Sequence, residues 1–252
     1  PPWAVRLMPA LLASAVVPLA GLITRQLNHK QKESAIATAA VAVTLLPLMR
    51  HGRLAMLDGA LVSASGLLWW QLLVSRHCRG WPLLGCGLLS GLACSGLLLL
   101  KAPLLLPVLG IGLLLLLLDQ QHSRAQWLLL ILGLALGLLP GLGWHGLHYL
   151  IRGSDALLLW GADGASRVLL SSGEGSDLGW RVPVLEVLEG GWPWLALWPF
   201  AVVLAWKQRH LSAGRWLLGL QLAMAMAVLP LRTQLPWYSH ILWLPFALLC
   251  AP

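Results

Sequence analysis

The stretch Pro47–Ala60, PLMRHGRLAMLDGA, ends one apolar run and opens the next, with basic side chains and one carboxylate at the junction. An Asp at the centre of a bilayer costs about 2.5–3.5 kcal/mol. We expect a helix to start near Leu54, which puts Asp58 one turn into it, where the positive helix end stabilises a carboxylate together with Arg50 and Arg53. Two interpretations are open: a functional charged site at a membrane face, or an interfacial loop in which Asp58 balances its basic neighbours.

The composition is that of a membrane protein. Of the 252 residues, 58% are hydrophobic and 10% are charged, whereas an ordinary soluble domain carries about 25% charged residues. The apolar runs are continuous and do not alternate with a period of two, which excludes a closed barrel. The sequence therefore predicts an all-α, polytopic transmembrane helical bundle that forms a single membrane-embedded domain over residues 1–252.

Nine runs approach the length of a membrane helix, which takes roughly 20 mainly apolar residues. We expect about eight or nine membrane helices, near residues 8–24, 35–49, 54–75, 83–99, 103–118, 126–149, 192–206, 216–232 and 237–250. Several of these runs are short. The runs 103–118 and 237–250 are therefore either re-entrant or span only where the bilayer thins.

The formal net charge of +8 does not indicate a nucleic-acid-binding protein. The 17 Lys and Arg residues lie singly or in pairs between apolar runs and form no basic domain for a phosphodiester backbone. The cysteines, Cys78, Cys86, Cys94 and Cys250, show no CxxC pair and no disulfide framework, so we expect them to be packing residues. The chain begins PPW, without a recognisable signal peptide, which leads us to expect an N-terminal truncation.

The loop charges suggest an orientation. The polar loop RQLNHKQKES after the first run is basic, as is typical of the cytoplasmic side. With alternating sides, nine Lys and Arg residues face the cytoplasm and eight face out, while Glu33 and Asp119 are the only acidic residues inside. We therefore expect a multi-pass protein of the plasma (inner) membrane, with its site facing the periplasm or exterior.

With this orientation, the charged residues that interrupt apolar runs and the long 150–191 segment lie on the outer side. Lys101 stands in a break between two Leu-rich runs, LLLLKAPLLLP, where Pro103 disfavours helical continuation. Lys101 is either a snorkelling side chain at a helix end or a point-charge ligand for phosphate. Residues 150–191 form an extracytoplasmic loop, which is either a solvated connection or a lid over substrate, with a short helix at VPVLEVLEG.

Histidines offer one weak metal pattern. His145 and His148 have the i, i+3 spacing of two ligands, but no third ligand is identifiable, so we expect interfacial hydrogen bonding instead. No metal site is predicted and no cofactor is certain. A divalent metal stays possible, because Asp58 and the acidic residues of the outer loop are available as ligands.

The order of features resembles the ArnT/PMT-like branch of the GT-C glycosyltransferases, enzymes that move a sugar from a polyprenyl phosphate carrier onto an acceptor outside the cytoplasm. The similar pieces, in order, are RLMPALLASAVVPLAGLITRQL, RHGRLAMLDGAL, GLLSGLACSGLLLLKAPLLLP, WGADGASR with GGWPWLALWP, and TQLPWYSHILWLP. Together they cover nearly the whole chain. The resemblance implies a GT-C-like domain that lacks the family's earlier transmembrane helix and its first outer loop, which bears an acidic residue thought to act in catalysis.

The chain departs from the family pattern at three positions. Gln234 stands where the family often has Lys, which removes one expected cation. Leu100 and Ala102 stand where the family usually has Thr and Gly, so only Lys101 and Pro103 support that part of the match.

The resemblance, together with sidedness, implies a role for each site residue. The phosphate leaves as an anion, so cations must stabilise it and a carboxylate must accept the acceptor's proton. The catalytic residue is then Asp58, which positions the acceptor or shares the base role. The cations for the donor phosphate are Lys101 and Arg167, with Arg53 and Arg232 as further candidates. The residues that shape the substrate pocket are Trp160, Tyr238 and His240.

The resemblance thus predicts a hexosyl- or pentosyltransferase. Its partners are a polyprenyl-phosphate-linked sugar, a lipid, glycan or protein acceptor, and membrane lipids, but no nucleic acid. The alternatives are a non-enzymatic polytopic protein, either a lipid-carrier transporter or a scaffold of an envelope assembly, and an inactive fragment. A transporter should carry charges near the bilayer midplane, often in broken helices. Here the ionisable groups cluster at helix ends, which favours the transferase.

Overall fold

The computed structural model describes residues 2–28, 32–52, 54, 56–156, 179–232 and 235–251, and all regular structure in these ranges is helical. The α-helices are α1 (Pro2–Ser14), α2 (Val16–Leu27), α3 (Lys32–Thr44), α4 (Leu46–Gly52), α5 (Asp58–Ser75), α6 (Trp81–Lys101), α7 (Leu105–Asp119), α8 (Arg124–Arg152), α10 (Arg181–Gly190), α11 (Trp198–Lys207), α12 (Ser212–Val228) and α13 (His240–Cys250). The 3-10 turns are η1 (Ala102–Leu104), η2 (Trp194–Ala196) and η3 (Pro236–Ser239).

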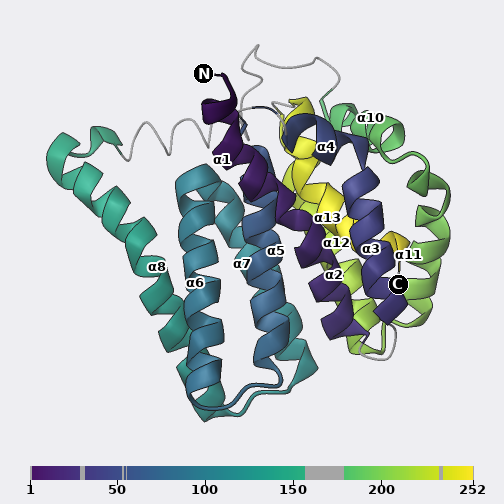
Figure 1. Cartoon of the computed structure of the whole chain (residues 1–252). Helices are drawn as coiled ribbons and strands as arrows, with labels where there is room; N and C mark the ends of the chain where they lie inside the picture. Colours follow the sequence, from purple (N-terminus) through teal and green to yellow (C-terminus); the bar gives the residue numbers. More distant parts are fainter. Residues whose placement is uncertain are drawn as a thin grey trace.

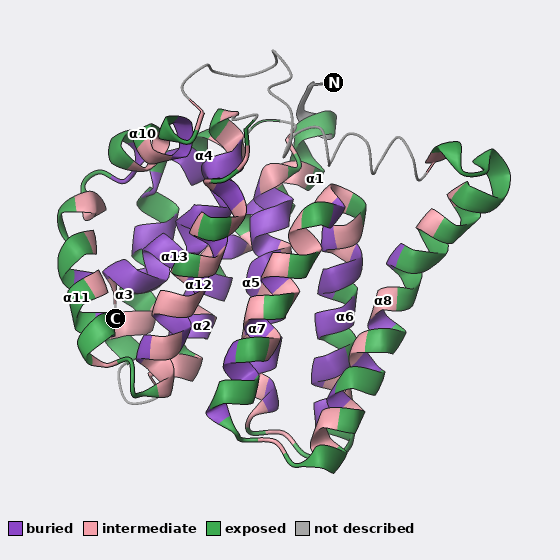
Figure 2. Cartoon of the chain, turned by 180° about the vertical axis from the view of Figure 1, so that it is seen from behind, coloured by how far each residue is buried: buried purple, intermediate pink, exposed green. Residues whose placement is uncertain are grey.

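Helix α5 lies inside the bundle and is buried around most of its circumference, as expected of a helix that is apolar on every face. It packs against α6 on one side and α2 on the other, while α8 stands at one edge and α10 and α11 at the opposite edge (Figure 1). Figure 2 shows buried residues along α5 and α13 and mainly exposed residues on the outer faces of α8 and α11. The exposed side chains there are large and apolar, for example Leu128 and Phe200, as suits contact with lipid.

The expected number of membrane helices is only partly supported. In the part of the chain that the structure describes, three continuous helical stretches are long and apolar enough to cross a membrane: Val5–Leu27, Trp81–Asp119 and Arg124–Arg152. Two bent helix pairs, α3 with α4 and α10 with the segment Trp194–Lys207, raise the number to five if each pair is one span. The multi-pass helical class is confirmed, whereas eight or nine spans are not.

The stretch Trp81–Asp119 reverses direction at its middle. Lys101 has the non-helical angles φ −162° and ψ 74°, and the η1 turn follows it. Pro103 explains the break, because it has no N–H to continue the α-helical ladder. Lys101 pairs with Asp58 at the start of α5, and Asp119 pairs with Arg76 just after its end. The two pairs therefore place α6 and α7 as antiparallel helices alongside α5.

Three boundaries differ from the sequence expectation. Helix α5 begins at Asp58 and not near Leu54, so Asp58 is its first residue rather than one turn in. Helices α8 and α10 occupy both ends of the expected 150–191 loop, and the predicted helix over VPVLEVLEG is confirmed within α10. Helix α13 is 11 residues long, about 17 Å, which is short of the roughly 30 Å of a hydrocarbon core. All its residues are buried.

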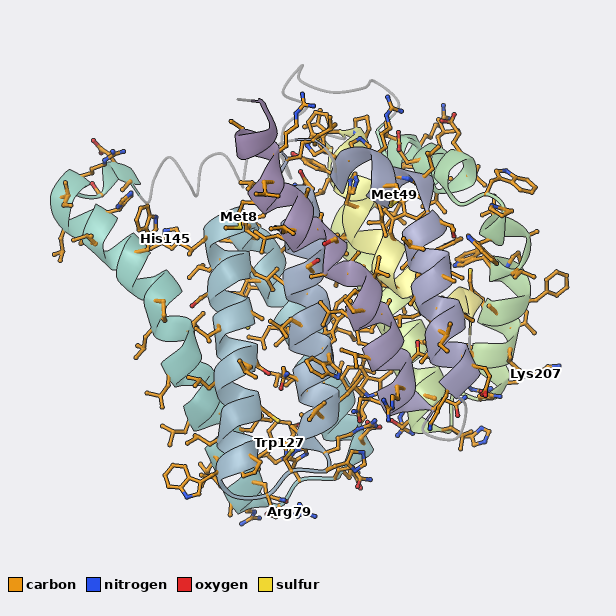
Figure 3. The ribbon with its side chains drawn as sticks, viewed as in Figure 1. Met8, Met49, Arg79, Trp127, His145 and Lys207 are labelled. Carbon is orange, nitrogen blue, oxygen red and sulfur yellow. The ribbon has the colours of Figure 1, made fainter. Side chains whose placement is uncertain are left out.

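The loops alternate between two ends of the bundle, as predicted. Arg79 and Lys207 lie toward one end, with Trp127 near the first, while Met49 and His145 lie toward the other (Figure 3). The first group belongs to the loops and helix ends that we assigned to the cytoplasm. That assignment itself stays a prediction.

A buried carboxylate joins three helices at the end of the bundle that carries Arg79. The side chain of Asp119 is 2% exposed and accepts hydrogen bonds from Arg76 at 3.1 Å, Arg215 at 2.8 Å, Ser212 at 2.8 Å and Trp216 at 2.8 Å. These donors come from the end of α5 and the first turn of α12. Asp119 therefore fixes the ends of α5, α7 and α12 relative to one another.

Helices α6 and α8 make the most extensive contact between any two described helices, and small residues bring their backbones together. A Cβ atom on Gly91 would overlap the carbonyl oxygen of Leu134, and one on Gly137 would overlap that of Leu88. Ser95 adds hydrogen bonds across the same seam, since its Oγ donates to the Gly137 carbonyl at 2.9 Å. This is the close approach that small residues allow between membrane helices.

Replacing Gly137 by Leu should therefore destabilise the bundle by roughly 1–3 kcal/mol or more, because the new side chain meets backbone atoms that cannot move aside. The control is Gly143→Leu on the same helix, where an added Cβ has no neighbouring heavy atom within 4 Å. The measurement is thermal unfolding in detergent, followed by circular dichroism. Equal Tm values for the two variants would contradict the tight seam.

Replacing Asp119 by Ala should lower the free energy of unfolding by about 3–5 kcal/mol, because it leaves the buried Arg76 guanidinium without its counter-charge. Asp155→Ala removes an exposed carboxylate three residues after the end of α8 and is the matched control. Denaturant titration of both variants measures the difference. An Asp119→Ala protein as stable as the control would show that the hydrogen bonds and ion pairs of Asp119 contribute nothing to stability.

Candidate active site

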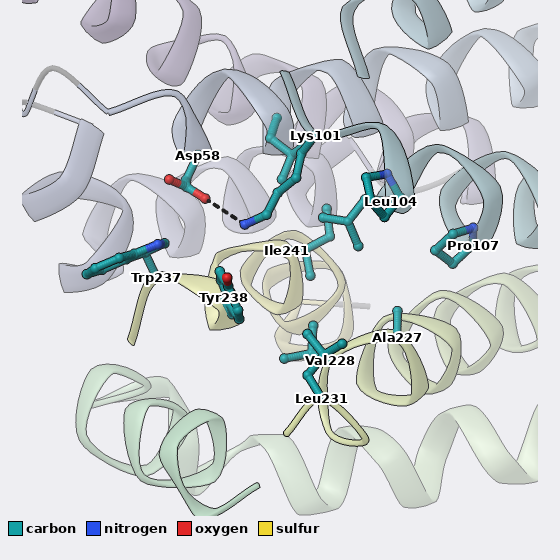
Figure 4. Close-up of a pocket in the computed structure, with 12 residues that line it drawn as sticks. Asp58, Lys101, Leu104, Pro107, Ala227, Val228, Leu231, Trp237, Tyr238 and Ile241 are labelled. Atoms are coloured by element: carbon teal, nitrogen blue, oxygen red, sulfur yellow. Dashed lines mark ion pairs between the residues drawn. The ribbon is translucent and has the colours of Figure 1, made fainter. Parts of the chain in front are cut away.

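The described charges at the start of α5 meet in one place. The ammonium Nζ of Lys101 lies 3.6 Å from the Asp58 carboxylate and 4.1 Å from the centroid of the Tyr238 ring (Figure 4). The Lys101 side chain is 32% exposed and that of Asp58 is 15% exposed. The ammonium is thus held by a carboxylate and an aromatic face while it keeps access to a ligand.

The three polar side chains lie at the wall of a cavity of about 230 Å³ that is otherwise apolar. The other lining residues are Leu61, Pro103, Leu104, Pro107, Ala227, Val228, Leu231, Trp237 and Ile241. In Figure 4 the Asp58–Lys101 pair lies away from Pro107 and Ala227, which belong to α7 and α12. The cavity therefore has a charged part and a hydrocarbon part, and the hydrocarbon part lies between α7 and α12.

Local sequence explains why these groups converge. Asp58 is the first residue of α5, where the positive end of the helix favours a carboxylate. Lys101 is the last residue of α6, where the negative end favours a cation. Tyr238 lies in the η3 turn, which Pro236 begins after the extended residue Leu235. Each polar group is thus supplied by the end of a helix or by a turn.

His240 adjoins this site without lining the cavity. It is 1% exposed, and its Nδ1 lies 2.9 Å from the carbonyl oxygen of Trp237. Its ring meets that of His51 on α4, with centroids 4.5 Å apart. His240 therefore follows the turn that carries Trp237 and Tyr238 and is buried outside the cavity that they line.

The structure thus brings together three of the residues predicted from sequence, Asp58, Lys101 and Tyr238. Arg232 follows the cavity residue Leu231 and is exposed. The remaining predicted residues, Arg53, Arg167 and Trp160, lie outside the described residues. Among the described residues there is no group of three or more His, Cys, Asp or Glu side chains placed to hold a metal ion.

Sequence reasoning missed two neighbours of the site. Trp237 lines the cavity, although a Trp next to an apolar run is usually part of the aromatic belt at the membrane interface. His51 contacts His240, a contact that neither of the two interpretations of this stretch included. Their positions in the sequence could have indicated both residues, because Trp237 precedes Tyr238 and His51 belongs to the same junction as Asp58.

Residues 1–150 match the sequence model of the family described as dolichyl-phosphate-mannose-protein mannosyltransferase, PMT. The chain belongs to this family. The PMT match includes Asp58 and Lys101, and it ends before Tyr238. The expected membership of the ArnT/PMT-like family is thereby confirmed.

The fold of this PMT-family chain is similar to that in the crystal structure of ArnT from Cupriavidus metallidurans bound to undecaprenyl phosphate. The TM-score is 0.80 at 16% sequence identity, and the alignment covers 99% of this chain. It covers 45% of the ArnT chain, so the sequence described here spans less than half of that protein. A comparison with curated protein sequences gives no match.

Proposed function

We propose that this PMT-family chain forms the donor site of a membrane glycosyltransferase, which moves a sugar from a polyprenyl phosphate carrier to an acceptor. One observation carries the proposal: a partly exposed ammonium, held by Asp58 and Tyr238, stands at the wall of an otherwise apolar cavity. Such a cavity suits an amphiphile with an anionic head and a hydrocarbon chain. The similar ArnT protein was crystallised with a ligand of this kind, undecaprenyl phosphate.

Lys101 has the direct role in this reaction. The bond between the sugar's anomeric carbon and the phosphate oxygen breaks, and negative charge develops on the leaving phosphate. An ammonium aimed at that charge in a water-poor cavity stabilises the transition state more than the ground state. Tyr238 and Asp58 hold the ammonium in place before the donor arrives, which lowers the cost of organising the site.

Asp58 and Arg232 have secondary roles. The acceptor atom that attacks the sugar must lose a proton, and Asp58 is the carboxylate within the cavity for positioning the acceptor or sharing that proton. Arg232 is exposed beside the cavity residue Leu231 and would add a second cation for the phosphate. We keep Arg53 and Arg167 as phosphate ligands and Trp160 as a sugar contact in this proposal.

The hydrocarbon part of the cavity suits the prenyl chain. Pro103, Leu104 and Pro107 line one side of the cavity, and Ala227 and Val228 line another. The chain would leave the charged part of the cavity between α7 and α12 and enter the bilayer there. Hexosyl and pentosyl donors both fit this scheme, as do lipid, glycan and protein acceptors.

We propose further that the site faces the periplasm or exterior of the plasma membrane. Two observations support this sidedness: the Asp58–Lys101 pair lies at the opposite end of α5 from Arg76, and that second end carries the loops with Arg79 and Lys207. Basic loops favour the cytoplasmic side.

A lipid-carrier transporter is the competing class. Its substrate site is expected near the midplane, at breaks in spanning helices. In the described part of the chain, α8 continues through Pro140, and the break at Lys101 lies at the end of α6. These features support the transferase over the transporter.

Replacing Lys101 by Met should reduce sugar transfer by about 10²–10³-fold, because it removes the charge while keeping most of the side-chain volume. Lys101→Arg should retain more activity, since a cation remains. Lys207→Met, at the other end of the bundle, is the control. The measurement is transfer from radiolabelled polyprenyl phosphate sugars in membranes, using the full-length protein. Undiminished transfer by Lys101→Met would show that Lys101 does not act on the donor.

Replacing Ala227 by Trp should raise the KM for a long-chain donor by about tenfold, equivalent to about 1.4 kcal/mol, by filling the hydrocarbon part of the cavity. A donor with a short prenyl chain should be affected less. The neighbouring Met226→Trp is the matched control, because Met226 is 66% exposed on the outer face of α12. Equal KM changes for the two donors would place the prenyl chain elsewhere.

A further inference from the structure

Two histidines meet edge to face behind the candidate site. The rings of His51, on α4, and His240, at the start of α13, have centroids 4.5 Å apart and planes at 88°. Neither residue lines the cavity. Carboxylates flank the pair on both sides, since Asp58 interacts electrostatically with His240, and Glu186 of α10 interacts with His51.

Hydrogen bonds fix the orientation of both rings. The Nδ1 of His51 lies 3.1 Å from the carbonyl oxygen of Pro47, and the Nδ1 of His240 lies 2.9 Å from that of Trp237. A carbonyl oxygen only accepts, so each Nδ1 must carry a hydrogen. The Pro47 carbonyl also interacts with the His240 ring, although the buried Nε2 of His240 makes no hydrogen bond of good geometry in the described residues. The backbone thus orients both rings and, in the neutral form, favours the tautomer with the hydrogen on Nδ1.

The two segments joined by this contact each supply one neighbour of Lys101. Asp58 follows α4 and His51 in the chain, while Tyr238 immediately precedes Ser239 and His240. Lys101 lies between these neighbours, 3.6 Å from the Asp58 carboxylate and 4.1 Å from the Tyr238 ring centroid. The spacing of the two segments therefore sets the position of the ammonium.

We infer that His51 and His240 are positioning residues of the candidate site, whose contact fixes α4 against the η3 turn and so keeps Asp58 and Tyr238 at the spacing that holds Lys101. The effect of this pair on donor binding rests on the proposed function. The tautomers and the ring contact do not, and they can be tested separately.

The first test is spectroscopic and needs no activity. Protein labelled with ¹⁵N-histidine in detergent, well above the ordinary histidine pKa of about 6.5, should show the resonances of His51 and His240, each assigned by its loss in the matching Phe variant, with the hydrogen on Nδ1. His51→Phe should remove one of them and shift the other, and His240→Phe should do the converse, because each ring is the other's neighbour. A hydrogen on Nε2 of either residue, or no mutual shift, would overturn the inference.

The second test measures the affinity for undecaprenyl phosphate. His240→Phe keeps the ring but loses the hydrogen bond to Trp237, and we expect binding about tenfold weaker. His240→Asn places an amide N–H near the position of Nδ1 and should recover binding to within about threefold of the original. His148→Phe changes a histidine of α8 that packs on Trp144 and is the matched control.

A purely structural role for His240 predicts a different result, in which the folded fraction falls but folded protein binds normally, with no specific recovery by Asn. That result, or unchanged binding by His240→Phe, would overturn the positioning role. If the original protein does not bind undecaprenyl phosphate at all, the proposed function fails instead. The histidine resonances then still test whether His51 and His240 are in contact.

Discussion

Ionised groups inside a membrane bundle must be paired or lie at helix ends, because an isolated charge away from water costs several kcal/mol. Helix α5 has such a pair at each end, Asp58 with Lys101 and Arg76 with Asp119. The Asp119 carboxylate is enclosed by four hydrogen-bond donors, whereas the Lys101 side chain is 32% exposed beside a cavity. One end of α5 is therefore enclosed by protein, and the other borders a cavity.

The Asp58–Lys101 end of α5 could be predicted from sequence because its residues interrupt apolar runs. Asp58 and Lys101 each stand alone among hydrophobic neighbours, and Pro103 predicts the break that Lys101 occupies. Tyr238 was predicted from the resemblance to the family, which rests on the order of the motifs. The start of α5 was less predictable, since the residues from Leu54 onward are as apolar as the helix itself. The charge of Asp58 marks the first turn better than hydropathy does.

The Arg76–Asp119 end of α5 and the His51–His240 pair depend on contacts between residues distant in sequence. Asp119 reaches Arg215 and Trp216, which are 96 and 97 positions away, and neither stands out within its own segment. His51 and His240 likewise meet only through the fold. Hydropathy alone left two interpretations of the run 237–250, re-entrant or spanning, because burial in protein and burial in lipid select the same apolar side chains. The position of α13 in the core therefore needed the structure.

Helix α13 has a consequence for how the protein is made. It is surrounded by α2, α3, α5, α11 and α12, all of which precede it in the chain and leave the ribosome first. All eleven of its residues are buried against protein. Because Tyr238 also follows all of these helices in the chain, its ring and the Lys101 ammonium can meet only after they have been made.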